Sequence, residues 1–311
     1  MTLSLSVVIP AHNEGARLER GFERLLPAIE PLGFDNVEIL VVDDGSSDDT
    51  GQRASALLRD LPHSLVIKLD ENQGKGGALK LGVSVAQGSR VVTCDADAAI
   101  NPTQLPTLLE ALEHADLAVG SRAVDGAIRY DSHLRTVAGS QFNRLVRKWT
   151  GSEVRDTQCG FKGFQQPVAR LFAIFGHIDG FAFDAEWLYL AGELGLTTVS
   201  VPVDWDDVEG STVSLGRHAW SMLRDIREIR KSPYRTVGVR VAPGTVDVDA
   251  VATTSRQARM RGIVLARGEQ DDIVVLPRDG APGALGIAKV CNGGMGLVGL
   301  SDLRNRHFES L

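Results

Sequence analysis

The 311-residue sequence has only three cysteines, Cys94, Cys159 and Cys291, and no two of them form a CxxC pair. This spacing excludes a disulfide framework and a cysteine-based zinc cluster as the basis of the fold. So few and so scattered thiols are typical of a reduced, cytoplasmic protein. We therefore expect a cytoplasmic protein that relies on a hydrophobic core, for which the chain is long enough.

Long apolar runs are also missing. The first apolar segment, residues 1–10, is interrupted by serines and stopped by Pro10 before it reaches the length of a signal peptide or a membrane span. No later stretch reaches the ~18 uninterrupted apolar residues that a spanning helix requires. Any membrane contact is therefore expected to be peripheral, at the inner membrane surface.

The sequence has no excess of positive charge, because 33 Lys and Arg stand against 40 Asp and Glu and give a net charge of -7. A general nucleic-acid binder needs a strong positive field to hold the phosphate backbone. Neither a basic face nor a basic tail supplies that field here. Nucleic acid is therefore excluded as a partner.

What the sequence does contain is an alternation of short apolar runs and longer amphipathic segments, which is typical of repeated βα units. The pattern predicts an α/β fold with a mainly parallel sheet flanked by helices. Asn13, the cluster 46–49 and Asn101 are the expected caps of the first, second and fourth helices. Strands are expected at residues 5–10, 37–43, 63–69, 89–95 and 116–121, and helices near 14–29, 48–60, 75–87 and 102–114.

After residue 121 the alternation loosens, and beyond Pro233 the composition shifts to Gly, Val, Thr and Asp. The sequence therefore predicts a catalytic domain at 1–232 and a small appendage at 233–311 that is β-rich or partly disordered and has no assigned role. The later elements of the first domain are expected as helices near 134–150, 184–194 and 215–231 and strands near 158–165 and 197–203.

The helix expected at 215–231 has an apolar stripe and several arginines on its other faces. Such a helix can lie on a membrane, where anionic lipid attracts the basic residues. It can equally pack its apolar stripe on the protein core and leave the basic side in water. Both interpretations stay open at this point.

Ligands of parallel α/β sheets bind at the carboxyl ends of the strands, so the residues that follow each strand are candidates for a site. Asp95 and Asp97 follow the fourth expected strand. Two carboxylates at this spacing can both reach Mg²⁺ or Mn²⁺, whose remaining ligands would be water and a diphosphate. An isolated DxD is usually only an acidic turn, but its place at the end of a buried strand favours a metal site.

The segment NQGKGG at 72–77 follows the third expected strand. Its glycines would let a ligand approach the backbone closely, Lys75 could reach a phosphate, and the start of a helix favours anions. The segment lacks the spacing of a P-loop, and a plain turn with a helix cap is the alternative.

Six motifs occur in a fixed order: IPAHNE, VVDDGSSDDT, NQGKGGAL, DAD, GSR and DTQCGFKGF. Over about residues 4–231 the chain resembles the inverting glycosyltransferase family 2, and within it the branch that glycosylates dolichyl or polyprenyl phosphate. The resemblance implies the GT-A fold, with a nucleotide-binding half and an acceptor-binding half. Two departures are Thr212, where the family often has a lysine, and the lack of the membrane spans common in the glucosyl branch.

The resemblance also assigns roles to single residues. Arg122 and Arg135 match arginines that hold the acceptor phosphate, for which a guanidinium fork is suited, although a surface arginine is by default only a solvated charge. The residues implied for catalysis are Asp95, Asp97, Gln158, Lys162 and Asp184, and those implied for the metal are Asp95 and Asp97. The nucleotide sugar would be bound by Pro10, Ala11, Asn13, Glu14, Asp44, Gly74, Lys75 and Asp95. The acceptor would be bound by Arg122, Arg135, Gln158 and Lys162.

The implied reaction is one in-line displacement that moves a hexose to a lipid phosphate, with UDP-glucose as the favoured donor. An alternative is the same displacement on a soluble hydroxyl acceptor, with GDP-mannose or a UDP-sugar as donor. A hydroxyl needs a general base, for which Asp184 or Asp156 is available. A nucleotide-sugar-binding protein without turnover is a third interpretation, which the intact Asp95 and Asp97 disfavour.

Overall fold

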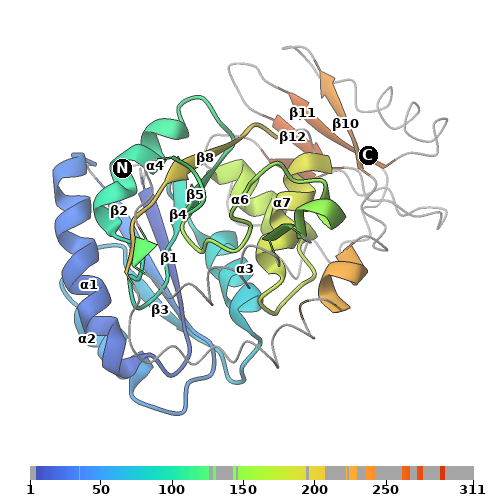
Figure 1. The fold of residues 1–311 in the computed structure, drawn as a ribbon. Coiled ribbons are helices and arrows are strands. Elements are labelled where there is room, and N and C mark those ends of the chain that lie inside the picture. The colour runs from blue at the N-terminus through green and yellow to red at the C-terminus, as the bar shows by residue number, and fades with distance from the viewer. Residues whose placement is uncertain are drawn as a thin grey trace. The chain divides into compact units, whose positions relative to one another are not determined.

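The structure is a computed structural model, and its first compact unit holds a seven-stranded sheet (Figure 1). In sequence order the strands are β1 (Leu5–Ala11), β2 (Val37–Asp43), β3 (Leu65–Lys68), β4 (Arg90–Thr93), β5 (Leu117–Ser121), β7 (Lys162–Gln165) and β8 (Thr198–Pro202). The structure describes residues 5–34, 36–125, 129–130, 143–144, 146–193, 196–206, 222 and 224–229, and the backbone of the strands at 236–241, 261–266, 272–275 and 288–290.

The strands of this sheet lie in the order β3-β2-β1-β4-β7-β5-β8. All neighbours pair in parallel except β7, which runs antiparallel to both β4 and β5. The mainly parallel α/β fold expected from the sequence is therefore confirmed. Because β7 is reversed, its first residue lies at the edge where the parallel strands end.

Helices cover both faces of this sheet. They are α1 (Gly15–Ile29), α2 (Thr50–Leu57), α3 (Lys75–Val85), α4 (Leu105–Ala111) preceded by a 3-10 turn (Pro102–Gln104), α6 (Gln166–Phe175) and α7 (Phe183–Glu193). Apolar side chains of α1, α2 and α4 pack with those of β1 in one core cluster. On the opposite face Gly82 of α3 lies against Val8 and Val42. The sheet is thus buried on both sides, which explains why β1 and β2 are almost continuously apolar.

The helix starts differ in part from the expectation. Asn101 does accept a hydrogen bond from the backbone N–H of Thr103, as predicted for a cap. Asn13 does not cap α1, because it adopts a positive φ of 55° and its side chain accepts hydrogen bonds from Ser47 instead. The prediction of Asn13 as a helix cap was therefore wrong, and the residue joins two loops at the end of the sheet.

Several secondary-structure elements also differ from those expected from the sequence. The strand expected at 158–165 begins only at Lys162, because residues 156–161 form a buried turn before it. The helix α6 was not predicted at all, although Gln166 and Arg170, four positions apart, give its sequence QPVARLFAIF a polar side. The short strands β6 (Arg129–Tyr130) and β9 (Trp205–Asp206) pair in a separate two-stranded ribbon.

Parts of two expected helices are described. Residues 143–144 and 146–150 are helical, as are 222 and 224–229. Ile226 and Ile229 are buried in a small cluster with Val146, Ala182 and Ala185. The apolar stripe of the last helix thus packs on protein in its described part, whereas membrane contact by 215–231 stays a prediction. Arg135 lies outside the described residues, as does Thr212.

A second unit comprises residues 190–196 and 231–311, and its strands form a sheet of their own. The strands β10 (Thr236–Val241) and β11 (Arg261–Ala266) are parallel, while β12 (Asp272–Val275) and β13 (Ala288–Val290) continue the sheet in antiparallel fashion. The described residues of this region are strands, whereas the boundary and the role of the appendage stay predictions. Among the helices that the structure describes, none combines the length and the apolar character needed to cross a membrane.

Candidate active site

The candidate site lies where β1, β2, β4 and β5 end and where β7 begins. The residues that follow these strands come together there, because the carboxyl ends of parallel strands share one edge. Asp95 follows β4, Arg122 follows β5, and Lys162 is the first residue of β7, directly opposite Thr93 of β4. Residues far apart in the chain therefore meet at one place.

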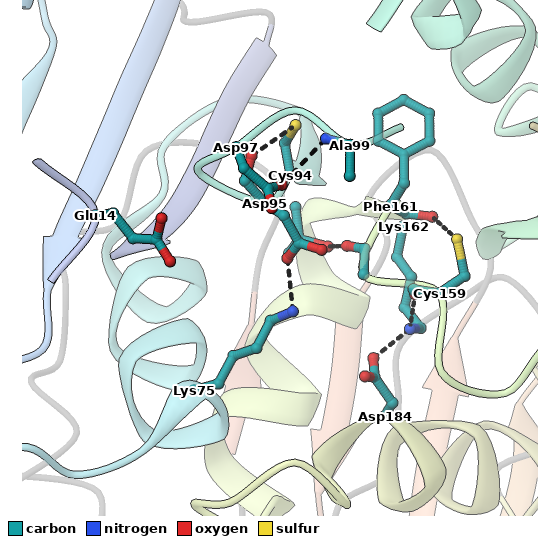
Figure 2. Close-up of polar contacts among 12 residues, drawn as sticks. Glu14, Lys75, Cys94, Asp95, Asp97, Ala99, Cys159, Phe161, Lys162 and Asp184 are labelled. Carbon is teal, nitrogen blue, oxygen red and sulfur yellow. Dashed lines mark hydrogen bonds and ion pairs between the residues drawn. The ribbon is translucent and has the colours of Figure 1, made fainter. Parts of the chain in front are cut away.

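An ion pair at this edge joins Lys75 to Asp95 (Figure 2). The ammonium Nζ of Lys75, at the start of α3, lies 2.6 Å from Oδ1 of Asp95. Burial would raise the pKa of Asp95, but the charge of Lys75 outweighs it and holds this pKa below its usual range. Asp95 is therefore ionised at neutral pH and already placed beside a cation.

Asp97 and Glu14 extend this acidic region, and Figure 2 draws Glu14 on the side of Asp95 and Asp97 away from Lys162. Burial and the neighbouring charge of Asp95 raise the pKa of Asp97. Burial also raises the pKa of Glu14 to about 7, with Asp97 and Asp95 adding to the shift against the opposing effect of Arg17. The Oε2 atom of Glu14 is buried and has no hydrogen-bond partner.

These carboxylates fit a hard divalent cation. Their oxygens are the donors that Mg²⁺ and Mn²⁺ prefer, and a cation would relieve the mutual repulsion that adds to the effect of burial on the pKa values of Asp97 and Glu14. No group of three or more acidic, histidine or cysteine side chains within the described residues is arranged to enclose a metal by itself. The cation would therefore be held by few protein ligands and complete its shell with water and a diphosphate.

Lys162 and Asp184 form a second ion pair next to the first (Figure 2). Both side chains are almost fully buried, and the ammonium of Lys162 also donates a hydrogen bond to the carbonyl of Cys159. Burial raises the pKa of Asp184, while Lys162 and Lys75 oppose that shift. The pair brings two predicted catalytic residues, 22 positions apart, into direct contact.

Gly160 explains why the turn before β7 can come so near the acidic pair. A Cβ atom on Gly160 would lie 2.8 Å from both carboxylate oxygens of Asp95, so a larger residue would collide with them. The hydroxyl of Thr93 donates a 2.7 Å hydrogen bond to the Gly160 carbonyl and fixes the turn. The glycine of the DTQCGFKGF motif thus makes room for Asp95.

Arg122 is held by Asp156 in a bidentate ion pair. Its Nε lies 2.7 Å from Oδ2 and its Nη2 lies 2.9 Å from Oδ1, and the backbone N–H of Arg122 donates to Oδ2 as well. The guanidinium also lies over the ring of Trp205, 5.7 Å from its centroid. Burial would raise the pKa of Asp156, but Arg122 keeps it below its ordinary range, which makes Asp156 a poor general base.

The nucleotide-side residues line the ends of β1 and β2. Pro10 and Ala11 end β1, and the buried carboxylate of Asp44 follows β2. Asp44 accepts hydrogen bonds from the backbone N–H groups of Gln73 and Gly74, at 2.7 and 2.9 Å. It therefore ties the end of β2 to the turn that carries Lys75.

Gln158, which was predicted for catalysis and acceptor binding, makes few contacts, and its neighbour Cys159 was not predicted as a site residue. Gln158 is half-buried and donates a long 3.4 Å hydrogen bond to the Thr157 carbonyl. Burial raises the pKa of the Cys159 thiol to about 12, so it is not a nucleophile at neutral pH. Sequence reasoning missed Trp205 and the partnership of Asp156 with Arg122, because nothing local in the sequence indicates contacts across 34 or more positions.

Comparison with known proteins agrees with this geometry. A sheet of this order, with an acidic pair after β4, is the GT-A fold. It is similar in structure to glucosyl-3-phosphoglycerate synthase from Mycobacterium tuberculosis, crystallised with Mn²⁺, UDP and glucosyl-3-phosphoglycerate. The TM-score is 0.57 at 21% identity, over 76% of this chain and 83% of that one.

The chain belongs to glycosyltransferase family 2, whose sequence profile matches residues 6–172. It is 36% identical to the dolichyl-phosphate beta-glucosyltransferase of Drosophila melanogaster over 73% of this chain and 74% of that protein. It is 33% identical to the protein of the same name from Dictyostelium discoideum, over 73% of both chains, and 34% identical to the human one, over 68% and 69%. The family resemblance of the sequence motifs is therefore confirmed.

Proposed function

We propose that this glycosyltransferase moves glucose from UDP-glucose to the phosphate of a dolichyl or other polyprenyl phosphate, with inversion at the anomeric carbon. The observation that carries the proposal is the set of fixed cations around Asp95: Lys75, Lys162 and Arg122 each lie in an ion pair at the same edge of the sheet. The names of the relatives support glucose and dolichyl phosphate.

On the donor side, Asp44 and the turn it holds orient the nucleotide, and Lys75 faces the diphosphate. Asp95 and Asp97 would hold Mg²⁺ or Mn²⁺, which neutralises the departing nucleoside diphosphate. Solved structural neighbours contain Mn²⁺ or Mg²⁺ together with UDP, which supports the choice of ion. Lys75 adds a second positive charge on the same leaving group, because its ammonium already lies beside Asp95.

On the acceptor side, a lipid phosphate is already anionic at neutral pH and needs no general base. The side chain of Arg122 is 26% exposed and its guanidinium is fixed by Asp156 and Trp205, so it loses little side-chain entropy when it binds a phosphate. Arg135 is proposed as a second phosphate contact from the resemblance alone. Because the acceptor is a lipid, we place the reaction at the cytoplasmic membrane surface.

A second candidate is transfer to a soluble hydroxyl acceptor. Asp184 favours it, because a buried carboxylate with a raised pKa at the centre of the site is suited to accept the hydroxyl proton. The lipid-phosphate reaction uses Asp184 only to hold Lys162.

Two variants separate these candidates when each is assayed on polyprenyl phosphate and on a panel of soluble hydroxyl acceptors. Replacing both Arg122 and Asp156 with Ala removes the guanidinium without stranding a buried carboxylate, and should lower kcat/KM for the phosphate acceptor by roughly ten- to hundredfold. Asp184→Asn should abolish hydroxyl transfer but only lower transfer to the phosphate acceptor, where Asp184 serves to hold Lys162. Each rate is expressed per folded enzyme, so that loss of folded enzyme is not mistaken for loss of transfer. A silent double variant beside an inactive Asp184→Asn would overturn the lipid-phosphate proposal.

A further inference from the structure

The loop at residues 176–180, which joins α6 to α7, lies directly on the start of α3. The backbone N–H of Gly77 donates a 3.1 Å hydrogen bond to the carbonyl of Asp179. Helices α3 and α6 lie side by side, so the loop is brought to the end of α3 that carries Lys75 (Figure 1). The loop between α6 and α7 therefore contacts the turn that is predicted to hold the donor.

The glycines of NQGKGG are explained by this loop. A Cβ on Gly74 would lie 2.5 Å from the carbonyl oxygen of Asp179, and one on Gly76 would lie 2.5 Å from that of Ile178. Both distances are shorter than any van der Waals contact allows, so the glycines admit protein backbone. Gly74 also has a positive φ of 94°, which favours glycine in its own right. The close approach that the sequence suggested for a ligand is thus made by the 176–180 loop.

Two buried charged side chains hold the loop in place. The carboxylate of Glu186, in the first turn of α7, accepts hydrogen bonds from the backbone N–H groups of His177 and Ile178 at 2.9 to 3.0 Å. From the other side Lys80 of α3 lies 2.6 Å from Oδ1 of Asp179 and donates to the carbonyl of Gly176. The loop is therefore fastened to α7 and to α3 at once.

We propose that Glu186 is a positioning residue: by holding the 176–180 loop against Gly74 and Gly76, it sets where Lys75 lies toward the donor diphosphate. Lys75 is flanked by these two glycines, so a shift of the loop must shift the start of α3. Displacement of a binding group by about 1 Å can cost on the order of a hundredfold in rate, so fixing this turn matters for the reaction. The inference rests on the proposed function, because it takes Lys75 as the ligand of the diphosphate.

The test is a double-mutant cycle on UDP affinity, measured by calorimetry with the full chain, UDP and Mg²⁺ at pH 8. Glu186→Gln keeps the shape of the side chain but removes the charge that accepts the N–H groups of the loop. It should weaken UDP binding about five- to tenfold in the otherwise unchanged protein. In a Lys75→Met background the same substitution should change it less than about twofold, because coupled residues are not additive.

Glu38→Gln is the matched control. Glu38 is likewise a buried carboxylate that accepts a backbone N–H, that of Gln87, but it lies at the start of β2, the end of the sheet away from the site. It should leave UDP affinity within about twofold even if it lowers stability equally. A merely structural role for Glu186 would make the two substitutions behave alike.

Asp179→Asn is the second variant, in case Glu186→Gln does not fold. The side chain of Asp179 is 59% exposed, and the substitution removes its ion pair with Lys80. It should weaken UDP binding in the same Lys75-dependent manner. Additive effects of Glu186 and Lys75, or equal effects of Glu186→Gln and Glu38→Gln, would overturn the inference. If Lys75→Met itself leaves UDP affinity unchanged, the donor site of the proposed function fails and the inference fails with it.

Discussion

Replacing Arg122 with Ala should destabilise the protein as well as slow it. The substitution removes the two side-chain hydrogen bonds that Arg122 donates to Asp156 and leaves, among the residues that the structure describes, the backbone N–H of residue 122 as its donor. The side chain of Asp156 is 1% exposed, so water cannot replace the lost partner. A charge without its counter-ion would then remain in the interior.

The size of the effect follows from this burial. Breaking a buried ion pair by removing one partner costs about 3 to 5 kcal/mol. Because the Arg122 side chain is 26% exposed and the backbone hydrogen bond survives, the expected loss lies at or just below the lower limit of this range, about 2 to 3 kcal/mol. For a unit of this size, that corresponds to a fall in Tm of roughly 4 to 12 °C.

The assay is thermal unfolding of the wild type, Arg122→Ala, and the variant with both Arg122 and Asp156 replaced by Ala. The double variant should recover most of the lost stability, because no charge is left buried. Arg122 keeps the pKa of Asp156 below its ordinary value, so its contribution is present above about pH 4 and is lost as pH falls further. A Tm change below ~2 °C in the single variant, or a double variant as unstable as the single one, would refute this reasoning.

The metal site, the buried Glu186 and the domain boundary can each be tested separately. Asp97→Ala should fold normally but lose turnover by at least about a hundredfold; full activity of this variant, or of the wild type in excess EDTA, would contradict the metal assignment. Burial raises the pKa of Glu186 to about 7, so the folded protein keeps a proton there that the unfolded chain releases. As pH rises from about 5 to 8, the free energy of unfolding of the wild type should therefore fall by up to about 3 kcal/mol relative to that of Glu186→Gln. Equal pH dependence of the free energy of unfolding in the two proteins would contradict this. Truncation near residue 235 should leave a folded protein that binds UDP-glucose, and an insoluble or non-binding product would disprove the proposed domain boundary.

The sequence predicted the sheet well because a strand buried on both faces needs a continuous apolar run, and such runs are easily read from β1 and β2. It also indicated Asp95 and Lys75, since polar motifs that follow strands must gather at one edge, whereas Lys162 was indicated by the family resemblance. Periodicity did not reveal α6, because this helix has only 10 residues and helical periodicity is judged over windows of roughly 11 to 18 residues.

Contacts between residues far apart in the sequence were harder to predict than the residues of the site themselves. The pairing of Arg122 with Asp156 and the fastening of the 176–180 loop by Glu186 depend on how elements pack, and local spacing carries no information about that. The glycines of NQGKGG were recognised as places of close approach, but the approaching group is protein backbone. A sequence motif can thus indicate that space is needed without indicating what fills it.

The proposed function is tested most directly by the transfer of label from UDP-[¹⁴C]glucose to dolichyl phosphate by the purified full-length protein with Mg²⁺. We expect a glucose-labelled lipid phosphate with the β configuration, and little or no product when GDP-mannose replaces UDP-glucose. Labelled lipid should be lost in Asp97→Ala and strongly reduced when Arg122 and Asp156 are both replaced by Ala. Transfer to soluble hydroxyl acceptors with no labelled lipid would contradict the proposed function.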